Sequence, residues 1–252
     1  MRYWNLIKNI SNWWLHIQQK FRLTDADPLL FKTRTGIVVE VPRRLLHEFK
    51  EIFLEEAYVG PFGFRLEKQP TILDIGANAG FFSLFAASRY PGAALVAFEP
   101  IPVNFAQLER NRELNRAVRM TCFQKAVFDF TGEISLTIDP RDSFTTAATI
   151  IKHHDRRNAS IQVPSISLDD LIEDLDVDGC DFLKMDCEGS EYEILLNSSF
   201  SSLRRIRQLA VETHRGADPS HSIATLRAHL ETSGFETVAD GSMLFARRLS
   251  AD

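Results

Sequence analysis

The sequence predicts an α/β fold in which a mostly parallel sheet carries helices on both faces. From residue 71 onward, short apolar segments of strand length alternate with helical patterns of about ten to fifteen residues. Acidic residues and glycines follow where several of these apolar segments end. The chain has 252 residues, of which 44% are hydrophobic and 25% charged, enough for one such domain with a short extension.

Residues 1–65 are predicted to form a helical and hairpin extension. Apolar side chains in residues 1–22 recur mostly every three or four positions, which predicts an amphipathic helix. This segment is rich in tryptophan and carries four Lys/Arg with no acid before Asp25. The helix is expected either to dock its tryptophan face on the domain or on a second copy, or to lie on a membrane surface. Residues 31–41 predict a hairpin, and Pro42 opens a helical pattern that continues to Ala57.

Composition limits the compartment and the partners. Cys122, Cys180 and Cys187 include no CxxC pair, which argues against a disulfide framework or a zinc site and favours buried thiols in the cytoplasm. No stretch approaches the ~18 apolar residues of a membrane span, and polar residues interrupt any signal-peptide pattern. The formal net charge of −5 argues against broad binding to nucleic acid.

Residues 66–252 are predicted to form the main domain. Its expected strands are residues 71–78, 94–100, 120–128, 132–139, a segment before Ser167, 181–186, 207–214 and a closing pair that ends near 243–248. Its expected helices are residues 80–90, 102–115, a segment capped by Ser167, 189–199 and 221–232. Residues 140–160 are polar and predict a loop. Because ligands bind beyond the carboxyl ends of such strands, site residues are expected near positions 75, 99, 126, 186 and 214.

The turn after the first strand of this domain carries a D-x-G-x-x-x-G motif, formed by Asp74, Gly76 and Gly80. Gly76 lets the backbone turn sharply and approach a ligand, and the carboxylate of Asp74 suits a ligand with a charged amino end. The spacing differs from the G-x-G-x-x-G of dinucleotide sites. Glu99 ends the next strand, where a carboxylate can accept hydrogen bonds from both hydroxyls of a ribose.

Several segments, in order along the chain, resemble the FkbM family of class I S-adenosylmethionine-dependent methyltransferases. They are LDIGANAGFFSLFAA, AFEPIPVNFAQLERN, KAVFDFTGEISL, SISLDDLI and FLKMDCEGSEYEILL followed by AVETH. The resemblance covers roughly residues 35–215. It implies a Rossmann-like, seven-stranded sheet whose last strand is antiparallel. It also implies methyl transfer, most often to a hydroxyl of a sugar or a polyketide-type natural product.

The resemblance also implies which residues contact S-adenosylmethionine. Gly76, Asn78 and Gly80 are expected beside the methionine part and Glu99 at the ribose, while Pro100, Ala126 and Val127 flank the adenine. The full expected set is Asp74, Gly76, Ala77, Asn78, Gly80, Phe81, Glu99, Pro100, Ala126 and Asp186. Many relatives carry a polar residue after the small one at the adenine, whereas residues 125–129 are largely apolar here. Backbone groups or Asp129 are therefore expected to contact the adenine.

A second motif, residues 184–191, ends a strand and begins a helix. Methyl transfer to a hydroxyl requires an aligned acceptor oxygen and a base that removes its proton. The candidate bases are Asp186, Glu188 and His214, with Asp186 preferred. Lys184 either takes a catalytic role or pairs with an acid across the site. His214 has a structural alternative, and Glu191 suits the first turn of a helix.

Other functions and a metal are weighed against this interpretation. The carboxylates and His214 at adjacent strand ends motivate Mg²⁺ as a secondary hypothesis, although no spacing typical of a metal site is present. A nucleic-acid methyltransferase is disfavoured, because Asp186-Cys187-Glu188-Gly189 replaces the Asn/Asp-Pro-Pro-aromatic element of those enzymes. A module that binds the cofactor without catalysis is the other alternative. The acceptor is expected to be a small molecule, sugar or glycan, selected by residues 1–65 and by the 140–160 loop. The basic residues of this loop either meet an anionic substrate or simply belong to a solvated surface loop; they are Arg141, His153, His154, Arg156 and Arg157.

Overall fold

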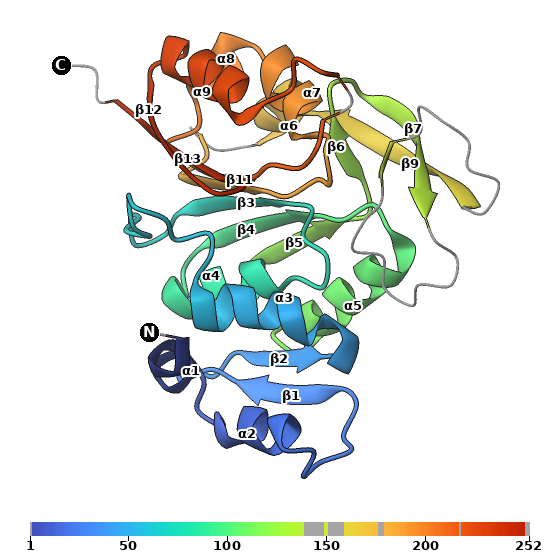
Figure 1. Ribbon diagram of the computed structural model, residues 1–252, viewed down its shortest axis with the longest axis vertical. Helices are drawn as coiled ribbons and strands as arrows, with labels where there is room; N and C mark the ends of the chain where they lie inside the picture. Colours follow the sequence, from blue (N-terminus) through green and yellow to red (C-terminus); the bar gives the residue numbers. More distant parts are fainter. Residues whose placement is uncertain (1, 139–148, 151–158, 176–178, 217, 250–252) are drawn as a thin grey trace.

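The computed structural model describes residues 2–138, 149–150, 159–175, 179–216 and 218–249. A seven-stranded sheet lies at its centre (Figure 1). The strand order is β12-β13-β11-β10-β3-β4-β5. The strands are β3 (Thr71–Ile75), β4 (Ala94–Phe98), β5 (Met120–Phe123), β10 (Phe182–Met185), β11 (Gln208–Glu212), β12 (Phe235–Asp240) and β13 (Met243–Arg248). β13 runs antiparallel to both of its neighbours, β11 and β12, and all other strand pairs in this sheet are parallel. The predicted fold, with its antiparallel last strand, is confirmed.

Helices cover both faces of this sheet, because successive strand residues point to opposite sides. Ile72 and Phe182 belong to the core beneath the sheet, whereas Leu73 and Leu183 belong to the core above it. The lower layer holds α4 (Phe81–Arg89) and α5 (Pro102–Glu113), and the upper layer holds α6 (Leu168–Asp174), α7 (Glu191–Asn197), α8 (Phe200–Leu203) and α9 (Ile223–Thr232) (Figure 1). No helix in the described ranges is long and apolar enough to cross a bilayer.

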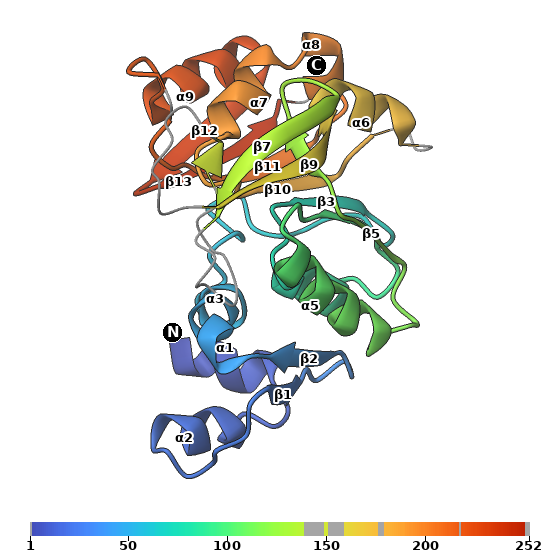
Figure 2. The ribbon, with the colours of Figure 1, turned by 90° about the vertical axis from the view of Figure 1, so that its right-hand side faces the viewer.

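The N-terminal extension packs against the lower helical layer, with its hairpin and first two helices below that layer and its last helical run level with it (Figures 1 and 2). It consists of α1 (Arg2–Asn9), α2 (Trp14–Lys20), the hairpin β1 (Leu29–Lys32) and β2 (Val38–Val41), and a helical run. That run comprises the 3₁₀ turn η1 (Arg43–Leu45), α3 (Leu46–Lys50) and the π-helical turn η2 (Glu51–Glu55). The hairpin and the helix after Pro42 are confirmed.

The single amphipathic helix expected over residues 1–22 is wrong, because the structure divides it into α1 and α2. Ile10 forms an antiparallel bridge with Thr33, and the Ser11 backbone N–H donates to the Lys32 carbonyl at 2.7 Å. These bonds to the hairpin replace helical ones. Leu6 and Ile10 supply the docked face, while Trp4 and Trp14 are 71% and 53% exposed. The expected docking of the tryptophan face onto the domain therefore does not hold for these two residues.

The extension shares one apolar core with the lower helical layer. Phe49 of α3 stacks on Phe31 of the hairpin at 4.4 Å between ring centroids and contacts Phe81 of α4 edge-on at 6.0 Å. Phe53 contacts Phe85 of α4 in the same edge-on manner at 5.6 Å. Such buried aromatic pairs fix the position of the extension on the domain. The residues after η2 are thereby directed toward the carboxyl ends of the central strands.

The strand expected over residues 120–128 is divided as well. β5 ends at Phe123, and β6 (Ala126–Phe128) joins a separate four-stranded sheet of order β6-β9-β7-β8. Its other strands are β7 (Gly132–Ile138), β8 (Thr149–Ile150) and β9 (Ala159–Ser167). Ser167 caps α6 by accepting a hydrogen bond from the Asp170 backbone N–H, as predicted. The basic residues expected in the 140–160 loop lie outside the described residues.

Candidate active site

A cavity of about 670 Å³ opens at the carboxyl ends of β3, β4 and β10. Of the residues expected at the cofactor, Gly76, Asn78, Glu99, Pro100, Ala126 and Asp186 line it, as does Val127. Ile101, and Ile134 and Leu136 of β7, add an apolar wall. The second sheet therefore closes the end of the cavity that Ala126 and Val127 occupy. Asp129 is exposed and does not line this cavity, which leaves backbone groups as the remaining one of the two contacts expected for the adenine.

The glycine loop can form only with glycine at position 76. Gly76 has φ +71°, and a Cβ at this position would lie 1.8 Å from the Asp186 carbonyl oxygen. Lys184 Nζ donates to the Gly76 carbonyl at 2.6 Å, which ties the loop to β10. Asn78 also has a positive φ of 49°. The loop is thus held in a backbone conformation that residues other than glycine rarely adopt, and its backbone forms part of the cavity wall.

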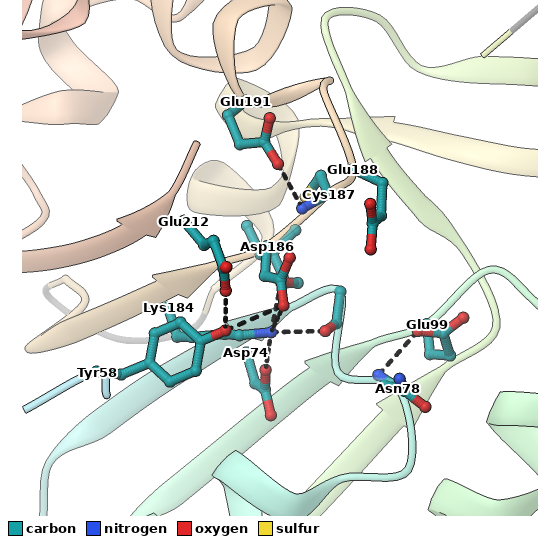
Figure 3. A network of polar contacts seen from close by, with 12 residues as sticks. Tyr58, Asp74, Asn78, Glu99, Lys184, Asp186, Cys187, Glu188, Glu191 and Glu212 are labelled. Atoms are coloured by element: carbon teal, nitrogen blue, oxygen red, sulfur yellow. Dashed lines mark hydrogen bonds and ion pairs between the residues drawn. The ribbon is translucent and has the colours of Figure 1, made fainter. Parts of the chain in front are cut away.

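Glu99 lies at the end of β4 and is 4% exposed. Its Oε2 accepts a hydrogen bond from the Asn78 backbone N–H at 2.8 Å, and Oε1 accepts one from the Ile101 N–H at 2.9 Å (Figure 3). Burial raises the pKa of Glu99 to about 7, against the lowering effect of these backbone donors. Oε1 also accepts a long hydrogen bond from Asn104 Nδ2 at 3.4 Å, whereas Oε2 keeps a lone pair for a further donor. One ligand hydroxyl can therefore bind Oε2 directly, and a second can compete with Asn104 for Oε1.

Asp74 and Lys184 form a buried pair beneath the loop. Asp74 Oδ2 accepts hydrogen bonds from the Ser83 N–H at 3.1 Å and from its hydroxyl at 2.7 Å. Lys184 Nζ lies 3.5 Å from Asp74 Oδ1 and 3.7 Å from Asp186 Oδ2. Burial lowers the pKa of Lys184, but the carboxylates of Asp186 and Asp74 outweigh it and raise the pKa. Lys184 therefore stays charged, and its contacts are those of the paired alternative.

Asp186 is held by a tyrosine from the N-terminal extension. Tyr58 Oη lies 3.0 Å from Asp186 Oδ2 and 3.0 Å from Glu212 Oε2 of β11 (Figure 3). Burial and the two carboxylates raise the pKa of Tyr58 well above its usual value, so the hydroxyl keeps its hydrogen. One hydrogen serves one acceptor at a time. The two carboxyl groups thus compete for a single donor at this point.

Tyr58→Phe is expected to lower kcat at neutral pH about tenfold or more while cofactor affinity changes far less. The Asp186 carboxylate loses a donor worth roughly 1.5–3 kcal/mol. The phenyl ring keeps its edge-on contact with Phe82, at 5.5 Å between centroids, so the fold should persist. Tyr90→Phe is the matched control, because Tyr90 Oη also makes two hydrogen bonds but lines neither cavity of the site. Equal kcat values for Tyr58→Phe and Tyr90→Phe contradict a role of Tyr58 in positioning Asp186.

His214 faces three carboxylates. Its Nδ1 lies 3.0 Å from Glu191 Oε1, and its Nε2 lies 3.7 Å from Glu188 Oε2 and 3.8 Å from Asp186 Oδ1. The hydrogen bond with Glu191, together with the charges of all three acids, outweighs burial and raises the pKa of His214 to about 9. The imidazole is therefore mainly protonated at neutral pH and is a poor acceptor for a substrate proton.

Glu188 is better suited to accept a proton. It lines the first cavity, and its φ of 53° is a left-handed conformation at the turn into α7 (Figure 3). Burial raises the pKa of Glu188 to about 7, while the neighbouring His214 lowers it. A carboxyl group with this pKa takes and releases protons near neutral pH. Asp186 and Glu188 thus remain as the two candidate bases.

Glu191 is fully buried and already satisfied by the chain. Oε1 accepts hydrogen bonds from the Cys187 N–H at 2.7 Å and from His214 Nδ1, and Oε2 accepts one from the Gly189 N–H at 2.9 Å. Single ligand atoms of Asp186, Glu191 and His214 all lie within 4.8 Å of one another. The backbone donors and the charged imidazole occupy the lone pairs that a cation would need. This arrangement fits an ion-paired turn better than the Mg²⁺ hypothesis.

A second cavity of about 380 Å³ lies beside the first. Its residues from the extension are Glu48, Glu51, Ile52 and Tyr58, and those from the domain include Phe81, Phe82, Lys184 and the expected cofactor residue Ala77. Gly76, Asn78 and Asp186 line both cavities. Burial, with the charges of Glu212 and Glu48, raises the pKa of Glu51, against the lowering effect of His47. The extension thus supplies an acidic wall opposite Asp186.

Comparison with known proteins identifies the family. The profile of the Methyltransferase FkbM domain matches residues 74–237. The chain belongs to the FkbM family of methyltransferases. The 31-O-demethyl-FK506 methyltransferase FkbM of Streptomyces tacrolimicus is 30% identical over 224 residues, covering 79% of this chain and 84% of that protein. Methyltransferase sdnD of Sordaria araneosa is 29% identical over 235 residues, covering 79% and 88%. Hexuronic acid methyltransferase AglP of Haloferax volcanii is 26% identical over 183 residues, covering 72% of each chain.

The FkbM family implies S-adenosylmethionine as the methyl donor, and the first cavity fits it. The wall at Gly76 is a close backbone approach that a Cβ would fill. The Oδ1 atom of Asn78 is buried there with no hydrogen-bond partner among the described residues. Glu99 offers two acceptor oxygens, and Ala126 with Ile134 offers an apolar surface. The Gly76 wall and Asn78 Oδ1 match the amino-acid end of the cofactor, Glu99 matches the ribose, and the apolar surface matches the adenine.

In this FkbM-family chain the structure brings together the residues expected at strand ends, but sequence reasoning missed others. Gly80 and Asp74 line neither cavity and shape the loop from behind. Sequence reasoning missed Tyr58, Glu48 and Glu51. Tyr58 lies in a turn-rich segment and the two acids in a helical pattern, and neither pattern indicates a contact with the end of β10, more than 120 residues later in the sequence. Ile134 and Leu136 carried a weak signal, because they are the alternating apolar positions of β7.

Proposed function

We propose that this protein transfers the methyl group of S-adenosylmethionine to a hydroxyl of a small-molecule, sugar or glycan acceptor and so forms a methyl ether. The observation that carries the proposal is the position of Asp186 in the wall that the two cavities share. Displacement at carbon requires the acceptor oxygen, the methyl group and the leaving sulfur in line. A carboxylate between a cofactor cavity and a second cavity is placed to align the acceptor and take its proton.

The residues of the chain then have distinct roles. When bound, S-adenosylmethionine supplies a methyl group activated by a cationic sulfonium. Glu99 binds the ribose hydroxyls, and the Gly76–Asn78 backbone holds the methionine part. Asp186 accepts the proton of the acceptor hydroxyl, with Tyr58 and Lys184 fixing its orientation. Glu188, whose pKa is near 7, is the alternative acceptor for this proton.

The lining of the second cavity favours a neutral, hydroxyl-rich acceptor. Glu48, Glu51 and Asp186 can accept hydrogen bonds from hydroxyl groups, and Phe81 and Phe82 add apolar surface. Lys184, the cation in this wall, is already engaged by Gly76, Asp74 and Asp186. A phosphate or carboxylate acceptor would therefore meet net negative charge. A neutral sugar or polyketide hydroxyl is favoured over nucleic acid and over a hexuronic acid.

Two further parts of the proposal concern location and partners. All three cysteines are free, which fits the reducing cytoplasm expected from the sequence. The exposed aromatic side chains of α1 and α2 add a surface for a partner, either a membrane or a second copy of the chain. The division of the chain into two parts near residue 65 remains a prediction, and it assigns acceptor choice to the extension that supplies Glu48, Glu51 and Tyr58.

The decisive experiment supplies methyl-labelled S-adenosylmethionine together with a panel of acceptors. The panel contains neutral free sugars, macrolides with free hydroxyls, nucleotide sugars, hexuronic acids and RNA, and the products are located by mass spectrometry and NMR. A methyl ether on a neutral acceptor is the expected result. Methylation of RNA contradicts the proposal. Calorimetric binding of the cofactor with no transfer to any member or to a cell extract favours the non-catalytic module instead.

A further inference from the structure

Exposed large apolar side chains are concentrated in α1, α2 and the segment that continues into β1. Seven of the thirteen large hydrophobic side chains that are exposed in the described residues lie between positions 3 and 30. We name them the N-terminal surface: Tyr3, Trp4, Ile7, Trp14, Phe21, Leu23 and Leu30. The other six are scattered between positions 103 and 249. Single exposed apolar residues are ordinary, but such a concentration marks an interaction site.

This surface is displayed by ordered structure. Leu6 and Ile10 are almost completely buried and anchor α1. The side-chain amide of Asn5 donates to the Leu54 carbonyl at 3.0 Å, and that of Asn9 donates to the Phe53 carbonyl at 2.7 Å. These bonds tie α1 to η2. The apolar side chains therefore stay exposed although their helices are packed against the protein, and collapse onto the core does not remove them from water.

The charge of the same segment differs in sign from that of the whole chain. Residues 1–34 contain six Lys/Arg and two acids, whereas the chain contains 29 Lys/Arg and 34 Asp/Glu. Arg2, Lys8, Lys20, Arg22, Lys32 and Arg34 are all exposed. Arg2 pairs with Glu55 at 3.2 Å and Lys8 with Glu56 at 3.8 Å. Both basic side chains are about half exposed, so these pairs do little to neutralise the surface.

We infer that the N-terminal surface docks on an anionic phospholipid membrane. Tryptophan and tyrosine prefer the interface between headgroups and acyl chains, and lysine and arginine beside them contact anionic lipid headgroups. This pairing of aromatic and basic side chains is typical of helices that lie in a membrane surface. A symmetric dimer through the same surface would bring its positive charges against one another, which disfavours a second copy as the occupant. Docking does not depend on methyl transfer, so the two proposals can fail separately.

The position of the tryptophans provides a direct test, because the three tryptophans of the sequence are Trp4, Trp13 and Trp14, all in this segment. Intrinsic tryptophan emission therefore reports this segment alone. We expect a shift to shorter wavelength with vesicles of phosphatidylglycerol and phosphatidylcholine, and little change with phosphatidylcholine alone. Flotation of the full-length protein should show the same lipid preference. Raising the salt from 0.1 to 1 M shortens the Debye length from about 10 to about 3 Å and should weaken this binding.

The Trp4→Ser/Trp14→Ser variant should lose at least tenfold in vesicle affinity. Phe200→Ser is the matched control, because Phe200 is 51% exposed, much like Trp14, but lies on α8 at the opposite face of the sheet. Lys8→Gln/Arg22→Gln should weaken binding only to anionic vesicles. Cofactor affinity and transfer to a water-soluble acceptor should be unchanged in all of these variants, which reports on folding and keeps the catalytic proposal separate.

Three results overturn the inference. The first is the absence of wild-type flotation with anionic vesicles, and the second is equal flotation of the Trp4→Ser/Trp14→Ser variant and the wild type. The third is a dimer in analytical ultracentrifugation that the same double substitution converts to a monomer, with no vesicle binding. That outcome assigns the surface to a second copy of the chain.

Discussion

Asp186→Asn is expected to reduce kcat by about 10²–10⁴, the usual contribution of a positioned base, while S-adenosylmethionine affinity changes far less. The amide keeps the size of the side chain but cannot accept the hydroxyl proton of the acceptor. It also replaces an acceptor oxygen near Tyr58 and Lys184, which now hold Asp186 Oδ2 at 3.0 and 3.7 Å. The measurement combines single-turnover methyl transfer with calorimetric titration of the cofactor.

Asp181→Asn is the control for this substitution. Asp181 lies just before the first residue of β10, at the opposite end of the strand from Asp186. Its Oδ2 accepts a hydrogen bond from the Thr71 N–H at 2.8 Å, and its Oδ1 forms an ion pair with Arg207 at 2.9 Å. It should lower stability without selectively lowering kcat. If Asp186→Asn weakens cofactor binding and leaves single-turnover transfer at saturating cofactor intact, Asp186 belongs to the methionine end. The role of base then passes to Glu188.

The fold was predictable because its central strands carry their own signals. β3, β4 and β10 are short apolar segments. The residues that follow them, such as Glu99 after β4 and Asp186 after β10, lie at the same edge of the sheet. Parallel strands bring their carboxyl ends together whatever the loops between them do. The first cavity therefore contains six of the ten residues expected at the cofactor.

The remaining parts of the site depend on tertiary packing that local patterns do not encode. Tyr58 reaches Asp186 across 128 residues of sequence because the phenylalanines of α3 and η2 dock the extension on α4. The division between α1 and α2 depends on a bridge from Ile10 to Thr33 of the hairpin. The protonated state expected for His214 depends on the carboxylates of Asp186, Glu188 and Glu191, which the turn from β10 into α7 brings against the end of β11. Periodicity reports which face of an element is buried, but not which distant element covers it.

Glu99→Ala is expected to weaken S-adenosylmethionine binding by about 1–3 kcal/mol, roughly fivefold to more than a hundredfold, through the loss of charge-assisted bonds to the ribose. Glu99→Gln should also bind weakly, because one end of an amide cannot accept hydrogen bonds. The Asn78 N–H and the Ile101 N–H both require an acceptor at this side chain. Calorimetric titration of both variants at pH 8 measures the loss, and unchanged affinity means that the ribose lies elsewhere.

The raised pKa of Glu99 adds a pH dependence with a definite sign. With a pKa of about 7 in the free protein, this carboxyl is largely protonated below neutral pH, whereas two ribose hydroxyls bind best to the ionised form. Cofactor binding should therefore release a proton at pH 6, and affinity should increase up to about tenfold per pH unit until it levels off above pH 7. Titrations in buffers of different ionisation enthalpy measure the number of protons released, and Glu99→Gln should flatten the pH dependence of the affinity.

Glu188 lines the same cavity with a pKa of about 7, so Glu188→Gln is the necessary comparison. If the pH dependence disappears in Glu188→Gln and persists in Glu99→Gln, the proton belongs to Glu188 and not to the ribose-binding carboxylate.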